Sequence, residues 1–376
     1  METTMNNLQK NLFELLASIV RTDSVGEVRA EDPVALLNLS FQYKIITVIY
    51  NYIADSKAKE IFTGAIVQSN VINANQQLEL KRILDYAETN GIFLLLLKGF
   101  CVGKFYPAGG FREMCDIDLY YKTEQKSRVE GMMQELGFVF RERKENHETW
   151  AKKDCNVFVE LHFSIADISD GLLSEILDRK IGFENYKNIF CMTDEDLYFY
   201  LLVHLHHHLK NGTYNFRQLL DIFVMKEKVG LDFSKVDKMI SRVDLKLFND
   251  NINKALDYIF DGVQSADVEG FVNYLSGNIS FENNAIAKLA SDSRGRVGFA
   301  LKRMFPKKEK FLIEYPYYKN RTLLLPVGYV KRIIHILKDK KEDAFYQYQV
   351  LKKIDDKMID NGREQKMFLG KYGIKS

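Results

Sequence analysis

The stretch that decides the fold is residues 94–121, LLLLKGFCVGKFYPAGGFREMCDIDLYY. It opens with an apolar run typical of a strand covered on both faces, followed by Lys98 and Gly99. Asp116 and Asp118 then flank Ile117 at the start of a second apolar run. Because side chains two apart leave an extended strand on the same face, we expect both carboxylates to point together. Two such carboxylates repel each other unless a cation lies between them, which predicts a divalent metal ion.

A later segment, residues 157–163 (VFVELHF), places a glutamate inside a run of strand-forming residues. Asp116, Asp118 and Glu160 together predict a two-metal site for phosphoryl-type chemistry. Magnesium prefers oxygen ligands, and two such ions can hold the attacking and leaving oxygens of an in-line displacement. Glu160 would complete the shell of one ion or accept the proton of the incoming nucleophile.

Three residues of the first stretch are candidates for contacts with phosphate. Lys98 and the Gly99 backbone lie where a short helix over residues 100–106 is expected to begin, and Arg112 lies in a glycine-marked turn. Each charged residue also has a structural alternative. The aspartates could belong to a solvent-facing strand, Glu160 could be an edge-strand charge, and Lys98 could cap a strand. Arg112 could pair with a structural carboxylate.

The order of these motifs resembles that of a known family, the uncharacterised nucleotidyltransferases of the polymerase-β-type nucleotidyltransferase superfamily. The matching elements are Leu97-Lys98-Gly99, Arg112, Asp116-Ile117-Asp118 and Glu160-Leu161-His162. The resemblance implies a nucleotidyltransferase core in which Asp116 and Asp118 bind the metals and Glu160 is the third carboxylate. Superfamily members more often have Gly-Ser where Lys98-Gly99 stands in this chain.

A looser similarity continues in the helical part of the chain. Members of the family tend to show helix histidines and then an arginine before an aspartate, which here are His204, His208, Arg217 and Asp221. With His162, these residues form a candidate acceptor pocket. The alternatives are a half-buried imidazole for His162, an i, i+4 ion pair between Arg217 and Asp221, and a zinc site on the HLHHH helix.

The periodicities predict an α+β fold with a small mixed sheet flanked by helices. We expect an N-terminal helical region over residues 1–90 and the nucleotidyltransferase-like α/β core over 91–190. A helical domain lining the cleft is expected over 191–300, and a basic helical region over 301–376. Thr193 and Asp196 are spaced like a helix N-cap and its partner.

The composition is that of a globular protein, with 46% hydrophobic and 28% charged residues in 376. No apolar run reaches the ~18 residues that span a bilayer, and the first residues do not look like a secretory leader. Four scattered cysteines without a C-x-x-C pair fit a reducing compartment. We therefore expect a cytoplasmic protein without a membrane span.

Positive charge gathers at the end of the chain. Residues 294–376 hold 21 Lys and Arg against nine Asp and Glu, although the whole chain carries only +2. Such asymmetry is typical either of a basic domain packed on an acidic one or of a partner rich in phosphate. No RNA-binding motif accompanies it, so a small molecule or a protein is favoured over RNA as the acceptor.

The sequence therefore predicts a nucleotidyltransferase that moves an NMP group from an NTP such as ATP to an unidentified acceptor and releases pyrophosphate. The expected cofactors are two Mg²⁺ (or Mn²⁺) ions with the bound NTP. The alternative is a non-catalytic module that has this fold and binds a nucleotide or a partner.

Overall fold

The computed structural model describes residues 5–22, 26–277, 305–308, 311–312, 315–339 and 356–374. The chain divides into two compact units. The first lies within Met1–Arg141, Asn146–His207 and Asn215–Asn278, and contains the sheet and most of the helices. The second lies within Glu142–Glu145, His208–Tyr214 and Ile279–Ser376.

The chain begins with helices, as predicted: α1 (Asn7–Thr22), α2 (Pro33–Gln42), α3 (Ile46–Ile49) and α4 (Ser56–Thr89). The carboxylates of Asp32 and Asp55 accept backbone N–H groups at the starts of α2 and α4, which satisfies donors that a helix leaves unpaired. The segment IITVIY, whose pattern alone also suits a strand, is helical. Helix α1 packs on α9 (Phe216–Lys228) and α11 (Lys246–Asp261), so the N-terminal helices join the later helical region.

A seven-stranded mixed sheet has the order β3-β4-β5-β2-β1-β7-β6, and confirms the α+β prediction. Its strands are β1 (Leu94–Leu96), β2 (Ile117–Tyr121), β3 (Val139–Arg143), β4 (His147–Lys152), β5 (Val157–His162), β6 (Ile181–Gly182) and β7 (Ile189–Cys191). Strands β1, β2 and β5 lie in the runs that the sequence marked as strands, with small shifts of their ends. Strands β6 and β7 are too short to give a periodic signal, and only pairing of β7 with the buried β1 identifies them.

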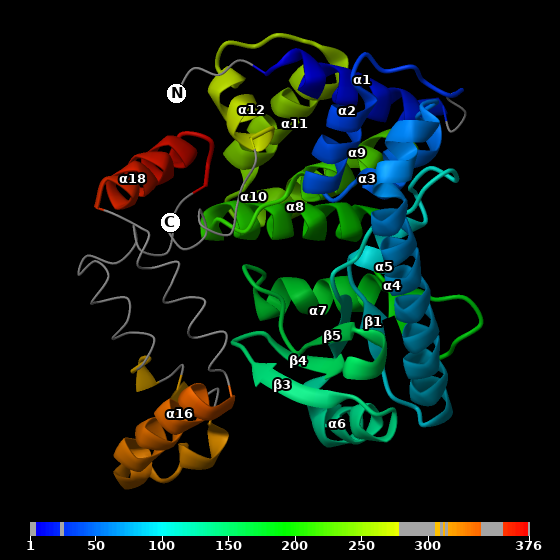
Figure 1. The fold of residues 1–376 in the computed structure, drawn as a ribbon. Helices are drawn as coiled ribbons and strands as arrows, with labels where there is room; N and C mark the ends of the chain where they lie inside the picture. The colour runs from blue at the N-terminus through cyan, green and yellow to red at the C-terminus, as the bar shows by residue number, and fades with distance from the viewer. Residues whose placement is uncertain are drawn as a thin grey trace. The chain divides into compact units, whose positions relative to one another are not determined.

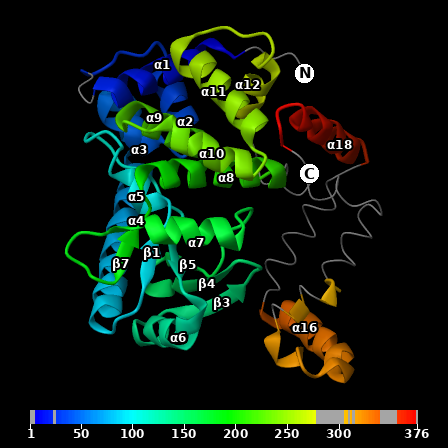
Figure 2. The same cartoon turned by 180° about the vertical axis from the view of Figure 1, so that it is seen from behind.

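Helices flank this sheet (Figures 1 and 2). Helix α4 packs against β5, β7 and α6 (Lys126–Glu135). In both views α7 (Asp170–Arg179) lies on the side of the sheet nearer to α8 (Asp194–Asn211), and α6 lies on the other side. Gly137 follows the end of helix α6 and has a φ of +84, a backbone conformation that favours glycine.

The remaining helices of the first unit are α8, α9, α10 (Phe233–Arg242), α11 and α12 (Glu269–Leu275). The predicted cap at the start of α8 is confirmed, because the Thr193 hydroxyl accepts the Asp196 N–H at 3.2 Å. Gly262 ends α11 in the left-handed region, with φ +68. None of the described helices combines the length and apolar character needed to cross a membrane.

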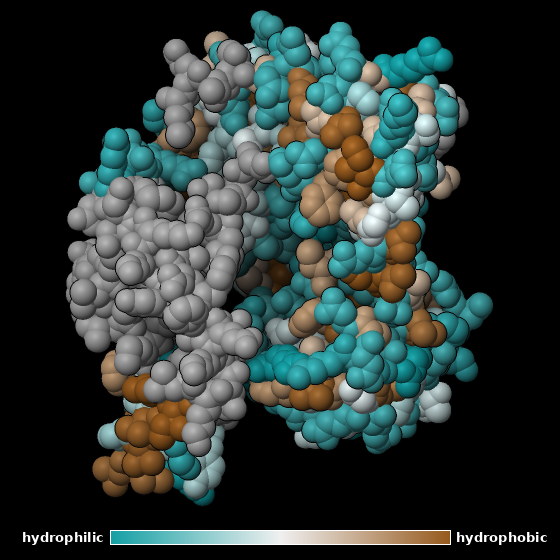
Figure 3. All heavy atoms as spheres, in the orientation of Figure 1, coloured by the Kyte–Doolittle hydropathy of each residue, from teal (hydrophilic) through white to brown (hydrophobic). Residues whose placement is uncertain are grey.

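The second unit contains α16 (Leu325–Asp339) and α18 (Asp356–Gly370). Helix α16 lies within the basic helical region predicted over 301–376. Apolar side chains are visible over α16 in Figure 3. The exposed apolar residues of this helix include Val327, Val330 and Ile334. Much of the basic region predicted over 301–376, and residues 278–300 of the predicted helical domain, lie outside the described residues.

Candidate active site

Sheet register brings the three predicted carboxylates together. Strands β2 and β5 are parallel neighbours, and Asp118 is paired with Glu160. Residues paired in this way leave the sheet on the same face, as does Asp116, two residues before Asp118. One oxygen from each of Asp116, Asp118 and Glu160 lies within 4.8 Å of the others. The convergence that the sequence predicted for these three residues is therefore present in the structure.

The donor set fits a hard divalent cation. Asp118 is 6% exposed, and its Oδ2 atom is buried without a hydrogen-bond partner among the described residues. A buried carboxylate oxygen without a partner is costly, and implies that another group binds there. The three oxygens are the ligand type that Mg²⁺ and Mn²⁺ take. Asp116, Asp118 and Glu160 could therefore hold such an ion.

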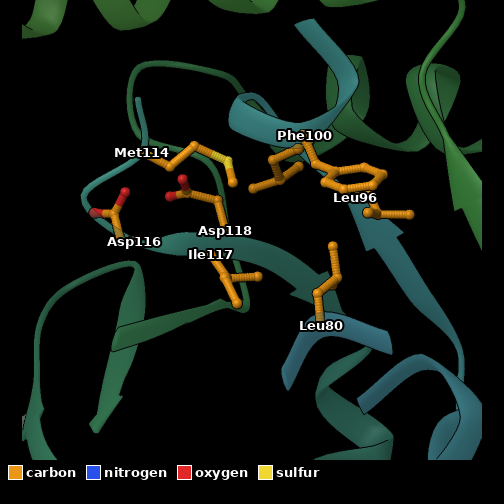
Figure 4. A pocket seen from close by; sticks show the side chains of 8 residues that line it. Leu80, Leu96, Phe100, Met114, Asp116, Ile117 and Asp118 are labelled. Atoms are coloured by element: carbon orange, nitrogen blue, oxygen red, sulfur yellow. The ribbon is translucent and has the colours of Figure 1, made fainter. Parts of the chain in front are cut away.

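A pocket opens beside the two aspartates (Figure 4). Their carboxylates lie next to each other at the start of β2 with Met114 beside them, and Phe100 lies across the pocket next to Leu96. The rest of the lining is apolar and comes from α4, β1 and β2: Leu80, Leu96, Leu97 and Ile117. Apolar walls lower the local dielectric and strengthen the field of the carboxylates.

The two aspartates differ in acidity. Burial, together with repulsion from Asp118, raises the pKa of Asp116 to about 6. Burial also acts against the charged form of Asp118, but the Lys98 ammonium and His162 outweigh it and hold the pKa of that carboxyl below its usual value. Asp118 is therefore firmly ionised, whereas the charged form of the neighbouring Asp116 is disfavoured.

Lys98 is the cation of this cluster. Its Nζ lies 3.1 Å from Asp118 Oδ1 and 3.0 Å from His204 Nε2. Burial disfavours the ammonium, but the attraction of Asp118 and Asp116 prevails and raises the pKa of Lys98 above its ordinary value. Lys98 is therefore charged, and links the carboxylates to the predicted pocket residue His204 on α8.

Gly99 packs closely against Met114. It opens α5 (Gly99–Gly103), a helix of only five residues that is shorter than predicted. A Cβ atom at Gly99 would lie 2.8 Å from Met114 Sδ, which is closer than side-chain atoms pack. The small residue thus lets the loop before the aspartates lie against α5.

Arg112 has a structural carboxylate partner, the alternative raised from the sequence. Its Nε and Nη2 atoms donate to the two oxygens of Asp221 at 2.7 Å each, and the Tyr106 hydroxyl donates to the same carboxylate at 2.7 Å. Arg112 and Asp221 are both buried. The fork that a phosphate would need is thus occupied by Asp221, and the i, i+4 pair considered for Arg217 and Asp221 is replaced by this longer-range one.

Arg217 holds the loop that leads to the aspartates. Its Nη1 donates to the Glu113 carbonyl at 2.6 Å, and its Nη2 lies 3.7 Å from Cys115 Sγ. Together with the Asp221 pair, this contact ties α9 to the chain just before Asp116. The predicted pocket residues of α9 therefore support the carboxylate loop.

Two histidines surround Glu160, and one of them was not singled out from the sequence. His162 Nε2 lies 3.2 Å from Asp118 Oδ1 and 3.6 Å from Glu160 Oε2. His147 Nε2 lies 3.2 Å from Glu160 Oε1. Burial works against the charge of Glu160, but the two imidazoles outweigh it and hold its pKa well below the usual range. His147 could have been found only from the hairpin register, which pairs it with His162 across β4 and β5.

The other candidate histidine of α8 lies at the end of that helix. His208 Nδ1 is 2.7 Å from the Thr213 hydroxyl. Neither cluster of metal-type ligands among the described residues contains His204 or His208, so the structure offers no support for the zinc site considered on this helix.

Comparison with known proteins places the chain in a family. The family model described as uncharacterised nucleotidyltransferase matches residues 30–260, more than half of the chain, and the protein belongs to this family. The family prediction from the sequence is thus confirmed. No protein of curated function matches the chain.

Two solved structures are similar to part of the chain. One is the solution structure of the antibiotic-resistance factor ANT(2″)-Ia, with a TM-score of 0.35 and 14% identity, over 45% of this chain and 91% of that chain. The other is the crystal structure of ANT(2″)-Ia in complex with adenylyl-2″-tobramycin, with a TM-score of 0.34 and 14% identity, over 44% and 94%.

Proposed function

We propose that this protein is a metal-dependent nucleotidyltransferase that transfers an NMP group from an NTP to an acceptor and releases pyrophosphate. The observation that carries the proposal is the convergence of Asp116, Asp118 and Glu160 at neighbouring positions of β2 and β5. Structural ion pairs do not need three acidic groups together, whereas sites for metal-dependent phosphoryl chemistry use such groups to hold the ions. Family membership supports the same reading.

The three carboxylates would hold the metal ions, with Mg²⁺ or Mn²⁺ as the expected species. When bound, these ions neutralise charge on the triphosphate and orient it for in-line attack. Glu160 is better suited to this role than to that of a general base, because its neighbouring imidazoles keep its pKa low.

Lys98 is placed to contact the triphosphate. It now neutralises Asp118, a task that a cation bound to the carboxylates would take over. Its ammonium would then be available to phosphate oxygens, as a mobile point charge at the edge of the site. Gly99 contributes by admitting Met114 beside this lysine, and we assign Arg112 to holding the loop through Asp221.

The test is label transfer from each of the four NTPs, with Mg²⁺ or Mn²⁺ and an extract as the source of acceptors. Asp118→Asn should reduce transfer and pyrophosphate release by about 10²–10⁴-fold, since it removes a metal ligand. Asp196→Asn is the matched control. Asp196 is equally buried but is paired with Arg179 and Thr193 at the start of α8.

The proposal requires folded variants and a clear contrast between them. Circular dichroism and thermal melts should show that both proteins are folded. If Asp118→Asn transfers label as fast as the wild type, the carboxylates do not carry out this chemistry. If the wild type binds NTP with metal but releases no pyrophosphate with any acceptor, the protein is a nucleotide-binding module.

A further inference from the structure

A second group of metal-type ligands lies beside the three carboxylates. One atom from each of His147, Glu160 and His162 lies within 4.8 Å of the others. The register explains the group, because His147 pairs with His162 across β4 and β5, and Glu160 precedes His162 by two residues. All three side chains therefore leave the sheet on one face. Glu160 is a member of both groups.

His147 is prepared as a ligand by its neighbour. Its Nδ1 lies 3.0 Å from Asn146 Oδ1, an atom that can only accept a hydrogen bond. In the neutral ring a proton on Nδ1 donates to this oxygen, and the lone pair of Nε2 is then directed away from Asn146. This is the arrangement by which a second residue fixes the tautomer of a metal-binding histidine.

Two buried polar atoms on this face lack partners. His147 is 7% exposed, and its Nε2 atom has no hydrogen bond of acceptable geometry among the described residues, although Glu160 Oε1 lies 3.2 Å away. The hydroxyl of Thr149, which pairs with Glu160 across the strands, is likewise buried without a partner within the described part of the chain. Buried polar atoms are almost always satisfied, so a missing group is implied at this place.

The distances suit a single ion. His147 Nε2 and His162 Nε2 lie 3.2 Å and 3.6 Å from the nearer oxygens of Glu160. Two ligands bound to one ion at about 2.0–2.2 Å lie roughly 3–3.5 Å apart. The two imidazole rings lie with centroids 4.9 Å apart, and the Nε2 atom of each faces an oxygen of Glu160.

We propose that His147, Glu160 and His162 form a second metal site, distinct in chemistry from the carboxylate site, that binds a divalent transition-metal ion. Two imidazoles and one carboxylate favour ions such as Zn²⁺ or Co²⁺ over Mg²⁺, which takes oxygen ligands. The inference goes beyond nucleotidyl transfer, because this site would bind its ion in the absence of nucleotide and whether or not the protein transfers NMP.

The experiment uses the full chain, stripped of metal by a chelator that is then removed, and Co²⁺ alone as the probe. Ligand-field absorption and calorimetry report the number and the affinity of the sites. We expect wild-type protein to bind Co²⁺ through nitrogen ligands. His147→Gln and His162→Gln should each weaken that site at least about 10–100-fold, the loss typical even of outer-shell changes at metal sites.

Two further variants separate this site from the carboxylate site and from nonspecific binding. Asp116→Asn alters the carboxylate cluster but none of the proposed ligands, so it should retain the Co²⁺ spectrum. His207→Gln is the histidine control. His207 lies on α8, its Nδ1 is 2.8 Å from Asp167 Oδ2, and it belongs to neither group. Its Co²⁺ affinity should equal that of the wild type.

The outcome does not depend on NMP transfer being found. Co²⁺ binding that is unchanged in both His147→Gln and His162→Gln would overturn the proposal, and so would the absence of any Co²⁺ site in the wild type. If circular dichroism shows that one of these two variants is unfolded, the Co²⁺ affinity of the other variant tests the proposal. Loss of NMP transfer in Asp118→Asn, or no transfer at all, leaves the Co²⁺ result unaffected.

Discussion

Two buried charged clusters lie at the two ends of the Arg112–Asp118 segment, and they are built on opposite principles. In the first, Asp221 receives two hydrogen bonds from Arg112 and one from the Tyr106 hydroxyl, so opposite charges are matched and paired. In the second, like charges gather at Asp116 and Asp118, and one buried oxygen has no partner among the described residues.

The difference distinguishes residues that hold the fold from residues that are placed to bind a ligand. A matched buried pair fixes geometry, and removal of one partner leaves an uncompensated charge. A cluster of like charges costs stability in the protein alone, and is retained where a ligand supplies the opposite charge. The arginine predicted to contact phosphate belongs to the first kind, and the aspartates belong to the second.

The largest stability effect should come from breaking the matched pair. Arg112→Met leaves Asp221 buried without its partner and should lower the free energy of unfolding by about 3–5 kcal/mol. Urea denaturation measures this loss. Arg112→Met combined with Asp221→Leu removes both charges and should recover a large part of it. A single variant as stable as the wild type would show that the pair is not needed for the fold.

Lys98→Met should show a smaller effect that depends on metal. Without metal it leaves Asp118 with His162 as its remaining charged partner, and should cost about 2–3 kcal/mol. Saturating Mg²⁺ should reduce this loss, because an ion at the carboxylates replaces the missing charge and stabilises the folded state. The loss in Arg112→Met should be the same with and without Mg²⁺.

Urea melts with chelator and with 10-fold steps of Mg²⁺ provide the comparison. If Mg²⁺ stabilises the wild type and both variants equally, Lys98 does not stand in for a cation. If Mg²⁺ has no effect on any of them, the carboxylates do not bind it in the absence of nucleotide.

Strands β1, β2 and β5 and the convergence of the carboxylates were predictable because they follow from short-range rules. Alternation along a strand puts Asp116 and Asp118 on one face. The order of the motifs along the chain identified Glu160 as the third carboxylate. The partner of Arg112 was not predictable, because Asp221 lies more than 100 residues away and only tertiary packing brings the two together. His147 was missed for a similar reason, since a strand register is needed to pair it with His162.

The smallest expected effect is a gain in stability from Asp116→Asn in metal-free protein. The pKa of Asp116 is about 6 in the folded protein, against an ordinary value of 3.8 for an aspartate. Between these values the folded state keeps a proton that the unfolded state releases, so wild-type stability falls as pH rises through this window. Asparagine avoids that loss, and should add about 1–2 kcal/mol at pH 7.5 and nothing below pH ~4.

Asp267→Asn is the control of opposite sign. Lys254 and Ser265 lower the pKa of exposed Asp267 to about 2, so its contribution is present at neutral pH and is lost on acidification. Its asparagine variant should therefore gain nothing at pH 7.5. Urea melts from pH 4 to 8 with chelator give the two curves. An Asp116→Asn protein no more stable than the wild type at pH 7.5 would mean that neither burial nor Asp118 penalises the charge of Asp116, which would remove the reason for a cation beside it.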